Sequence, residues 1–342
     1  MGLWGKSVVG LEMDTGMIRA VEVKGKNGAA KVVAAGEYPL PEKAVVEGVV
    51  QDVEAVSAAL QDLWREARFK SRDVVLGVFN QSVLLRLINF PKVPKEKLAQ
   101  AIRLQAGDYF PIPLSQLEFD FAVVGETEED GESKHRILLV AAKQTDLQQS
   151  IAAVVGSKLN PQVIDASLLA LLRTMPPERR RGTAVMVDLA LGVSSIVLAV
   201  DGMPRYARVL SVNLRDYFAE LGIQLGMGEG AAGYAAATVE PGSKSEALQR
   251  WHQAVAGEIR TFISFYLQQE ELGEVQAVLL SGRGARITGL ADYLRKELGV
   301  TVELVRPLAA VKTVKGTVQV DLNNPDFAVS TGLALRGLEG ER

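Results

Sequence analysis

Two short segments of the chain pair an acidic residue with a glycine-containing turn, a combination suited to holding a phosphate and its metal ion. Glu12 and Asp188 each close an apolar strand, and a glycine, Gly16 or Gly192, follows each of them four residues later. A turn between two strands can aim backbone N–H groups at phosphate oxygens, and an acid beside it can hold a hydrated Mg²⁺. Two such turns facing each other across a cleft would grip a nucleotide. The candidate nucleotide-binding residues of these turns are Glu12, Asp14, Thr15, Gly16, Arg19, Asp188, Ala190, Leu191 and Gly192, with Glu12 and Asp188 as candidate metal ligands through water.

A third turn completes the candidate site. Ser281, Gly282, Arg283 and Gly284 lie between a predicted strand over residues 275–280 and a predicted helix that begins at residue 285. Glycine lets a backbone approach a flat nucleoside closely. The pattern alone leaves a second interpretation open, in which all three are ordinary strand turns that contain glycine. No residue stands out as a general base, and no catalytic residue is assigned.

The turns belong to strand–turn–strand units that repeat along the chain. Apolar runs punctuated by turn residues predict three strands over 7–13, 18–24 and 31–38, and three more over 185–188, 194–200 and 206–212. A repeat at this distance predicts two halves of like fold. The predicted helices cover 52–69, 95–109, 145–159 (with Thr145 as N-cap), 245–271, 285–298 and 327–335; the further strands cover 73–79, 82–89, 117–124, 136–142, 275–280 and 300–305.

Composition excludes several classes of protein. Hydrophobic residues make up 48% and charged residues 23% of the chain, which is a globular composition. A net charge of −3 argues against a nucleic-acid binder, which would show a basic excess. The absence of cysteine excludes disulfides and thiolate metal sites, and the presence of only His135 and His252 excludes a His-rich metal site. Because no apolar run is long enough to span a membrane and no signal peptide is present, we expect a cytoplasmic protein.

Several blocks of the sequence carry a resemblance to a known family. The blocks are GLEMD (10–14), RAVEV (19–23), RLINFPKVP (86–94), AIRLQA (101–106), YFPIP (109–113), VD (187–188), LSGRGA (280–285) and FAVSTGLALR (327–336). The chain resembles the type IV pilus assembly protein PilM family, which is actin-like and related to the division protein FtsA. The resemblance covers nearly the whole chain in order. Its most specific part is the stretch over residues 86–113, because generic actin-like kinases lack it.

The resemblance implies an α/β fold of the actin/Hsp70/sugar-kinase type, with two domains and an FtsA-like inserted subdomain. The implied first domain covers residues 1–181, with the inserted subdomain at about 81–160, and is completed by 313–342; the second domain covers 182–312. The resemblance also implies ATP with Mg²⁺ in the cleft. It implies capture of the N-terminal cytoplasmic tail of a PilN-like membrane protein in a groove between the first subdomain and the inserted one. Other inner-membrane platform proteins of the pilus are implied partners, nucleic acid is not, and the chain would lie at the cytoplasmic face of the inner membrane through these partners.

The cleft residues depart from the family pattern. Asp14 stands where the family usually has glycine, and Arg283 interrupts the glycines of the third turn. Residues 190–192 replace the usual glycine of the second turn, and residues 231–236 lack the Glu and Lys that help to hold the nucleoside. A carboxylate at position 14 would repel phosphates. These departures predict weakened or lost nucleotide affinity and no significant turnover.

The sequence therefore favours an adaptor, an actin-like platform of type IV pilus or related secretion assembly that recruits a PilN-like tail and has a degenerate nucleotide cleft. The alternative is an active Mg-ATP-binding ATPase of the same fold, with Glu12 and Asp188 holding the metal. An FtsA-like protein that polymerises on a membrane is disfavoured, because residues 338–342 form no amphipathic C-terminal helix.

Overall fold

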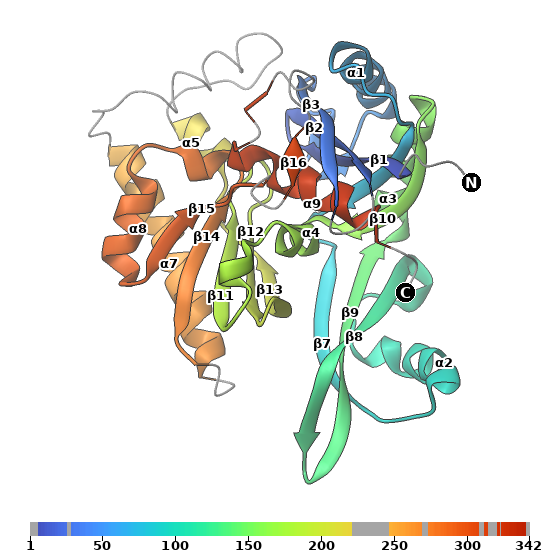
Figure 1. The fold of residues 1–342 in the computed structure, drawn as a ribbon, viewed down its shortest axis with the longest axis vertical. Helices are drawn as coiled ribbons and strands as arrows, with labels where there is room; N and C mark the ends of the chain where they lie inside the picture. Colours follow the sequence, from blue (N-terminus) through green and yellow to red (C-terminus); the bar gives the residue numbers. More distant parts are fainter. Residues whose placement is uncertain are drawn as a thin grey trace.

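Two β-sheets built in the same way form the centre of the molecule (Figure 1). They are seen in a computed structural model that describes residues 6–25, 29–220, 246–268, 273–307, 311–313, 320–321 and 323–339. The first sheet has the order β10 (Asn160–Ala166), β6 (Asp73–Val78), β1 (Lys6–Asp14), β2 (Met17–Gly25), β3 (Lys31–Pro39) and β16 (Lys312–Thr313). The second has the order β13 (Met203–Val209), β12 (Ser195–Val200), β11 (Thr183–Asp188), β14 (Val275–Ser281) and β15 (Thr301–Leu304).

The two sheets share one topology. In each, three consecutive strands pair antiparallel, a later strand pairs parallel with the first of the three, and one more strand pairs parallel with that later strand. The first sheet also carries β16, which pairs parallel with β3. This arrangement confirms the two like-folded halves that the repeated strand–turn–strand units predict. The first strand of each half is buried along almost its whole length, as expected for a strand covered on both faces of its sheet.

Helices cover both sheets and fill the space between them. Helices α1 (Val53–Glu66) and α3 (Gln144–Gly156) pack on the outer face of the first sheet, and α7 (Glu246–Leu267) and α8 (Leu290–Leu298) on the outer face of the second. Helices α4 (Ser167–Arg173) and α9 (Ala328–Arg336) lie between the sheets and share one apolar core with both. A Cβ atom on Gly332 of α9 would overlap the carbonyl oxygen of Ala170, so α4 and α9 meet backbone to backbone. The two halves are thereby joined by a buried core below the candidate site.

A third, smaller sheet projects from the first half, at the bottom of Figure 1. It has the order β7 (Leu84–Pro91), β9 (Glu132–Lys143) and β8 (Leu117–Glu129), and α2 (Lys95–Gln105) belongs to the same unit. Phe90, Ile102 and Leu139 are buried in a core of its own. The predicted pairing of residues 117–124 with 136–142 is confirmed, and the pairing extends to Glu129 and Glu132 at the tip of the hairpin.

The remaining elements are short. They are β4 (Val45–Val46), β5 (Val49–Val50), α5 (Leu214–Glu220), and the 3₁₀ turns η1 (Ala106–Asp108), η2 (Leu114–Gln116), η3 (Pro177–Arg179), η4 (Arg283–Arg286) and η5 (Pro325–Phe327).

Some of the predicted helix boundaries were wrong. The helix predicted to begin at residue 285 begins at Leu290, because a 3₁₀ turn and the left-handed Gly289 (φ 81°) come first. Thr145 is not an N-cap, since α3 begins one residue earlier with Lys143 at the cap position. The helix predicted over 95–109 ends at Gln105 and passes into η1. Strand β10 and helix α4 were not predicted at all.

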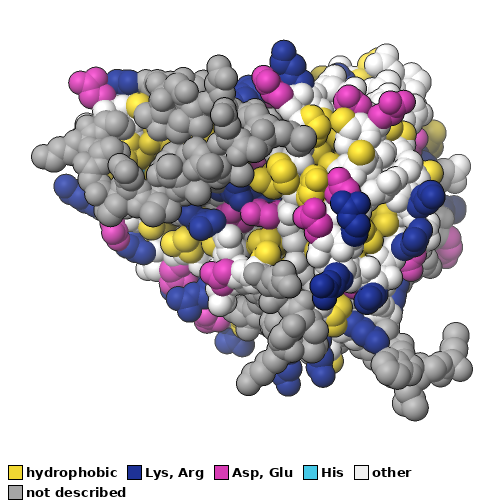
Figure 2. All heavy atoms as spheres, turned by 90° about the horizontal axis from the view of Figure 1, so that it is seen from above, with side chains coloured by type: hydrophobic (Ala, Val, Ile, Leu, Met, Phe, Trp, Pro, Cys, Tyr) yellow, Lys and Arg dark blue, Asp and Glu magenta, His cyan; other side chains and the backbone are white. Residues whose placement is uncertain are grey.

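The surface shows no segregation of charge on the face that Figure 2 displays. Acidic and basic side chains are both spread over the described part of that face. None of the described helices has the length and apolarity needed to cross a bilayer.

Candidate functional site

The first turn places a buried carboxylate against the backbone of the second turn. Asp14 ends β1, and its Oδ2 accepts a hydrogen bond from the Leu191 N–H at 3.1 Å. Its Oδ1 accepts hydrogen bonds from the N–H groups of Gly192, at 3.2 Å, and Thr15, at 2.7 Å. The two turns therefore face each other at the boundary of the two halves, and the Asp14 side chain bridges them.

The two turns are also in direct van der Waals contact. A Cβ atom on Gly192 would overlap Thr15 Oγ1, and one on Gly16 would lie 3.4 Å from Leu191 Cδ2. A phosphate oxygen must come within about 3 Å of a backbone nitrogen to accept its hydrogen bond. Because the N–H groups of Leu191 and Gly192 are already paired, and the turns leave no gap between them, these residues as arranged do not fit the phosphates of a nucleotide.

The third turn is tied to the second. Ser281 Oγ donates to Asp188 Oδ1 at 2.7 Å, and the Gly284 N–H donates to the Leu189 carbonyl oxygen at 2.8 Å. Gly282 has a φ of 75°, and a Cβ atom there would lie 2.7 Å from that same Leu189 oxygen, so this position requires glycine.

Arg283 of the third turn reaches across to the first half. Its Nη2 donates to both carboxylate oxygens of Glu37 on β3, at 3.1 and 2.9 Å, and its Nε donates to Asp326 Oδ2 at 2.9 Å. The guanidinium therefore pairs with two carboxylates of this chain. The Asp326 side chain is fully buried and also lies 3.4 Å from Arg286.

Three charged residues stand in a row across the first sheet. In the strand register Glu12 lies opposite Arg19, and Arg19 lies opposite Glu37. Arg19 Nη1 is 3.5 Å from Glu12 Oε1, and Arg19 Nε is 3.4 Å from Glu37 Oε2. The row places a positive charge beside the candidate metal ligand Glu12.

The two candidate metal ligands have perturbed pKa values. Burial raises the pKa of Glu12 well above its usual value, Arg19 opposes the rise, and Asp188 adds to it. Burial likewise raises the pKa of Asp188 to about 6; the hydrogen bond from Ser281 opposes the rise and the charge of Asp14 adds to it. The charge of Asp188 acts on the protonation of Glu12, and the charges of Asp14 and Asp326 act on both carboxylates, so Glu12 and Asp188 lie in one electrostatic environment.

The fit of this pair to Mg²⁺ is mixed. Glu12 Oε2 is buried and accepts no hydrogen bond within the described part of the chain, which leaves it available to a cation. Arg19 already supplies a positive charge 3.5 Å from the other Glu12 oxygen. Among the described residues, no three or more acidic or histidine side chains are arranged to hold a metal ion. Glu12 and Asp188 stay a prediction as metal ligands through water.

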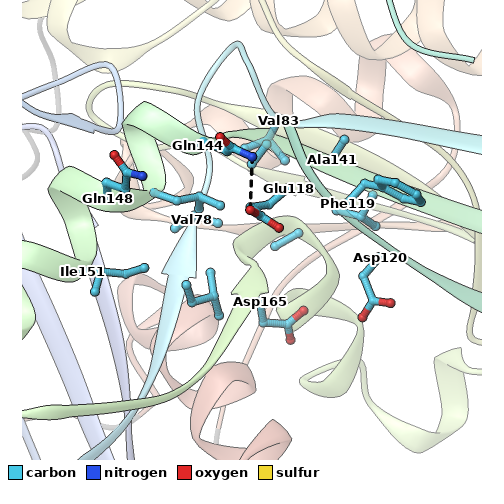
Figure 3. A pocket seen from close by; sticks show the side chains of 15 residues that line it. Val78, Val83, Glu118, Phe119, Asp120, Ala141, Gln144, Gln148, Ile151 and Asp165 are labelled. Carbon is cyan, nitrogen blue, oxygen red and sulfur yellow. Dashed lines mark hydrogen bonds between the residues drawn. The ribbon is translucent and has the colours of Figure 1, made fainter. Parts of the chain in front are cut away.

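A second candidate site is a cavity of about 450 Å³ between the inserted sheet and the first half (Figure 3). Its apolar walls include Val78, Val83, Phe119, Ala141 and Ile151, and polar side chains at its edge are Glu118, Asp120, Gln144, Gln148 and Asp165. Gln144 donates to Glu118 at 3.2 Å. Strands β8 and β10, which both line the cavity, are edge strands of their sheets. The cavity therefore combines an apolar interior, an acidic edge and the outer backbone edges of two strands that have no further strand beside them among the described residues.

The structure brings the predicted residues of the three turns into one buried cluster. It adds residues that the sequence analysis missed: Glu37, Asp326 and the pair Glu47–Arg215, whose side chains lie 3.2 Å apart across the two halves. Counting along the sequence does not place Glu37 opposite Arg19, because a register shift between Glu22 and Val23 changes the pairing of β2 with β3. Residues 231–236, which were predicted to lack two nucleoside contacts, lie outside the described residues.

Comparison with known proteins identifies the family. The family model described as type IV pilus assembly protein PilM matches residues 10–338. The chain belongs to the PilM family. Among solved structures, a "PilM-PilN type IV pilus biogenesis complex" superimposes with a TM-score of 0.84 at 28% identity, covering 97% of this chain and 99% of the other. The ethanolamine utilization protein EutJ from Carboxydothermus hydrogenoformans shares the fold alone, with a TM-score of 0.55 at 12% identity over 96% of this chain and 89% of its own.

Membership of the PilM family confirms the α/β, actin-like fold class that the resemblance implies, and makes the chain an actin-like protein of type IV pilus assembly. The most specific block of the resemblance, residues 86–113, supplies much of β7 and all of α2. This stretch therefore belongs to the inserted unit, whose strands β8 and β9 form one side of the cavity.

Proposed function

We propose that this chain is a platform protein that binds the N-terminal cytoplasmic tail of a PilN-like inner-membrane protein and is held by it at the cytoplasmic face of that membrane. The observation that carries the proposal is the cavity between the inserted sheet and the first half. Strands β8 and β9 of the inserted sheet form one side of it, and the similar solved structure is a complex of PilM with PilN.

The cavity has the chemistry that suits an extended tail with apolar and basic residues. An apolar side chain placed among Val78, Phe119 and Ile151 would be removed from water, which is worth about 1.5–3 kcal/mol for each aliphatic or aromatic side chain. Glu118 and Asp120 at the edge offer negative charge to basic residues of the tail. The edge strands β8 and β10 offer backbone groups to which an extended peptide can add as a further strand.

The proposal assigns no ATP turnover to the cleft. This part of the proposal is supported by the arrangement of the first two turns, in which the Asp14 carboxylate accepts hydrogen bonds from the N–H groups of Leu191 and Gly192. Hydrolysis would also require a positioned water and a general base, and none of the described cleft residues is set up for that role. In this proposal the chain acts by binding its protein partners, and the contacts between the turns hold its two halves together.

The test is a fluorescence-anisotropy titration of the full chain against a labelled peptide of the PilN-like tail. Ile151→Arg places a charge in the apolar wall and is expected to weaken binding by about tenfold or more, because a buried unpaired charge is costly. The matched control is Val155→Arg on the same helix, where Val155 is 55% exposed and lies outside the cavity lining. It is expected to bind within about twofold of the wild type.

Two results would contradict the proposal. One is a wild-type chain that does not bind the tail peptide. The other is equal binding by the Ile151 and Val155 variants, which would place the tail elsewhere on the molecule.

A further inference from the structure

The Asp14 carboxylate occupies the place that a bound anion would take. It accepts three backbone N–H hydrogen bonds, from Thr15, Leu191 and Gly192. Leu191 is 177 residues further along the chain, on the opposite half. Neighbouring backbone N–H groups of a turn form a concavity that binds anions. Here the anion that fills it is a side chain of the same molecule.

Two ion pairs also join the two halves of the molecule. Arg283 of the second half binds Glu37 of the first at 2.9 and 3.1 Å, and Arg215 binds Glu47 at 3.2 Å. The Glu47 N–H donates in turn to Thr15 Oγ1, at 3.2 Å, beside the first turn. Each ion pair joins one half to the other. The closed arrangement is therefore held by groups that belong to this chain.

The charge around Asp14 suits one anion at this position and not two. Glu12, Asp188 and Asp326 are buried near it, and the buried cations beside these acids are Arg19 and Arg283, of which Arg283 is paired with Asp326. A phosphate added beside Asp14 would bring further negative charge into a buried and acidic cluster, where Coulomb repulsion is strong. A phosphate that replaced the carboxylate would inherit its three N–H donors and would add less negative charge to the cluster than a phosphate bound beside Asp14.

We propose that Asp14 is a built-in substitute for a phosphate group, which fills the anion site shared by the two turns and latches the halves together without nucleotide. If the Asp14 side chain left these N–H groups, the ligand they would take is a phosphate anion, and Asp14 competes with that anion for them. This inference rests on the degenerate cleft of the proposed function and is independent of tail binding.

Isothermal titration of the full chain with inorganic tripolyphosphate and with Mg-ATP, together with thermal melting, tests the inference. Asp14→Gly is expected to bind both ligands about tenfold or more tightly than the wild type. Without ligand it is expected to melt at a lower temperature than the wild type, and tripolyphosphate should restore part of the loss. The matched control is Asp201→Gly, since Asp201 also accepts a backbone N–H in a turn, from Gly182 at 2.9 Å, but lies outside the cleft. It should gain no affinity.

A second variant covers the case in which Asp14→Gly does not fold. Asp14→Asn keeps the side-chain volume and removes the charge, and it too should bind tripolyphosphate more tightly than the wild type. Equal affinity of wild type and Asp14 variants, whether strong or absent, would overturn the inference. Tail-peptide binding measured on the same samples separates the two proposals. If only peptide binding is absent, the proposed function is contradicted. If only the gain in tripolyphosphate affinity of the Asp14 variants is absent, the role of Asp14 as a phosphate substitute is contradicted.

Discussion

The raised pKa of Asp188 makes the stability of the protein depend on pH in a specific direction. Burial raises this pKa from an ordinary 3.8 to about 6. The folded state therefore holds the proton more tightly than the unfolded state does. The stabilisation is complete below about pH 4 and is lost as the pH rises through about 6. A rise of this size corresponds to about 3 kcal/mol of unfolding free energy, a large part of the stability of an ordinary domain.

Asp188→Asn is the perturbation that isolates this effect. Asparagine keeps an oxygen that can accept the hydrogen bond from Ser281 Oγ, and it does not titrate. Urea unfolding of both proteins at a series of pH values between about 4 and 7 gives the difference in unfolding free energy at each pH. The wild type is expected to lose about 3 kcal/mol relative to the variant across this range. Parallel curves would refute the assignment of a buried, proton-binding Asp188.

Two further predictions concern the packing that joins the halves. Gly332→Ala should lower the unfolding free energy by about 1–3 kcal/mol, because its methyl group would overlap the carbonyl oxygen of Ala170. The control is Gly257→Ala in α7, where a Cβ would contact nothing, and it should instead stabilise the protein by up to about 1 kcal/mol. Equal effects of the two substitutions in thermal melts would disprove the close contact between α4 and α9. Arg283→Met should lower the unfolding free energy by about 3 kcal/mol, because it removes a buried cation from two carboxylates. Arg260→Met, which breaks an exposed ion pair, should lower it by less than about 1 kcal/mol. Similar losses for the two variants in urea titrations would show that the ion pairs of Arg283 are not buried.

The sequence predicts most strands of the two sheets well, because each of these strands carries an apolar–polar alternation or a continuous apolar run that can be recognised without knowing the fold. It fails at Asn160–Ala166, now β10, because the segment contains Pro161 and the adjacent Val163 and Ile164 break the apolar–polar alternation that marks a half-buried strand. It fails at the start of α8 because the local sequence is compatible with helix, and the choice of a 3₁₀ turn follows from the hydrogen bond between the Gly284 N–H and the carbonyl oxygen of Leu189, which directly follows β11. The division into domains at residues 181 and 312 stays a prediction.

The candidate sites show the same limit. The sequence identifies Asp14 as a departure in the first turn and predicts that it repels phosphate. It cannot show that the carboxylate pairs with N–H groups 177 and 178 residues away, because that contact exists only once the halves meet. The cavity is less predictable still. Its lining comes from β6, β8, β9, β10 and α3, and no local pattern marks residues that become neighbours through the edges of two sheets.

The measurement that tests the account most directly is the affinity of the wild-type chain for the PilN-like tail peptide, with and without Mg-ATP. The account predicts binding whose affinity changes by less than about twofold on adding the nucleotide, together with no steady release of phosphate. Binding that requires Mg-ATP, or sustained hydrolysis by the wild type, would contradict it.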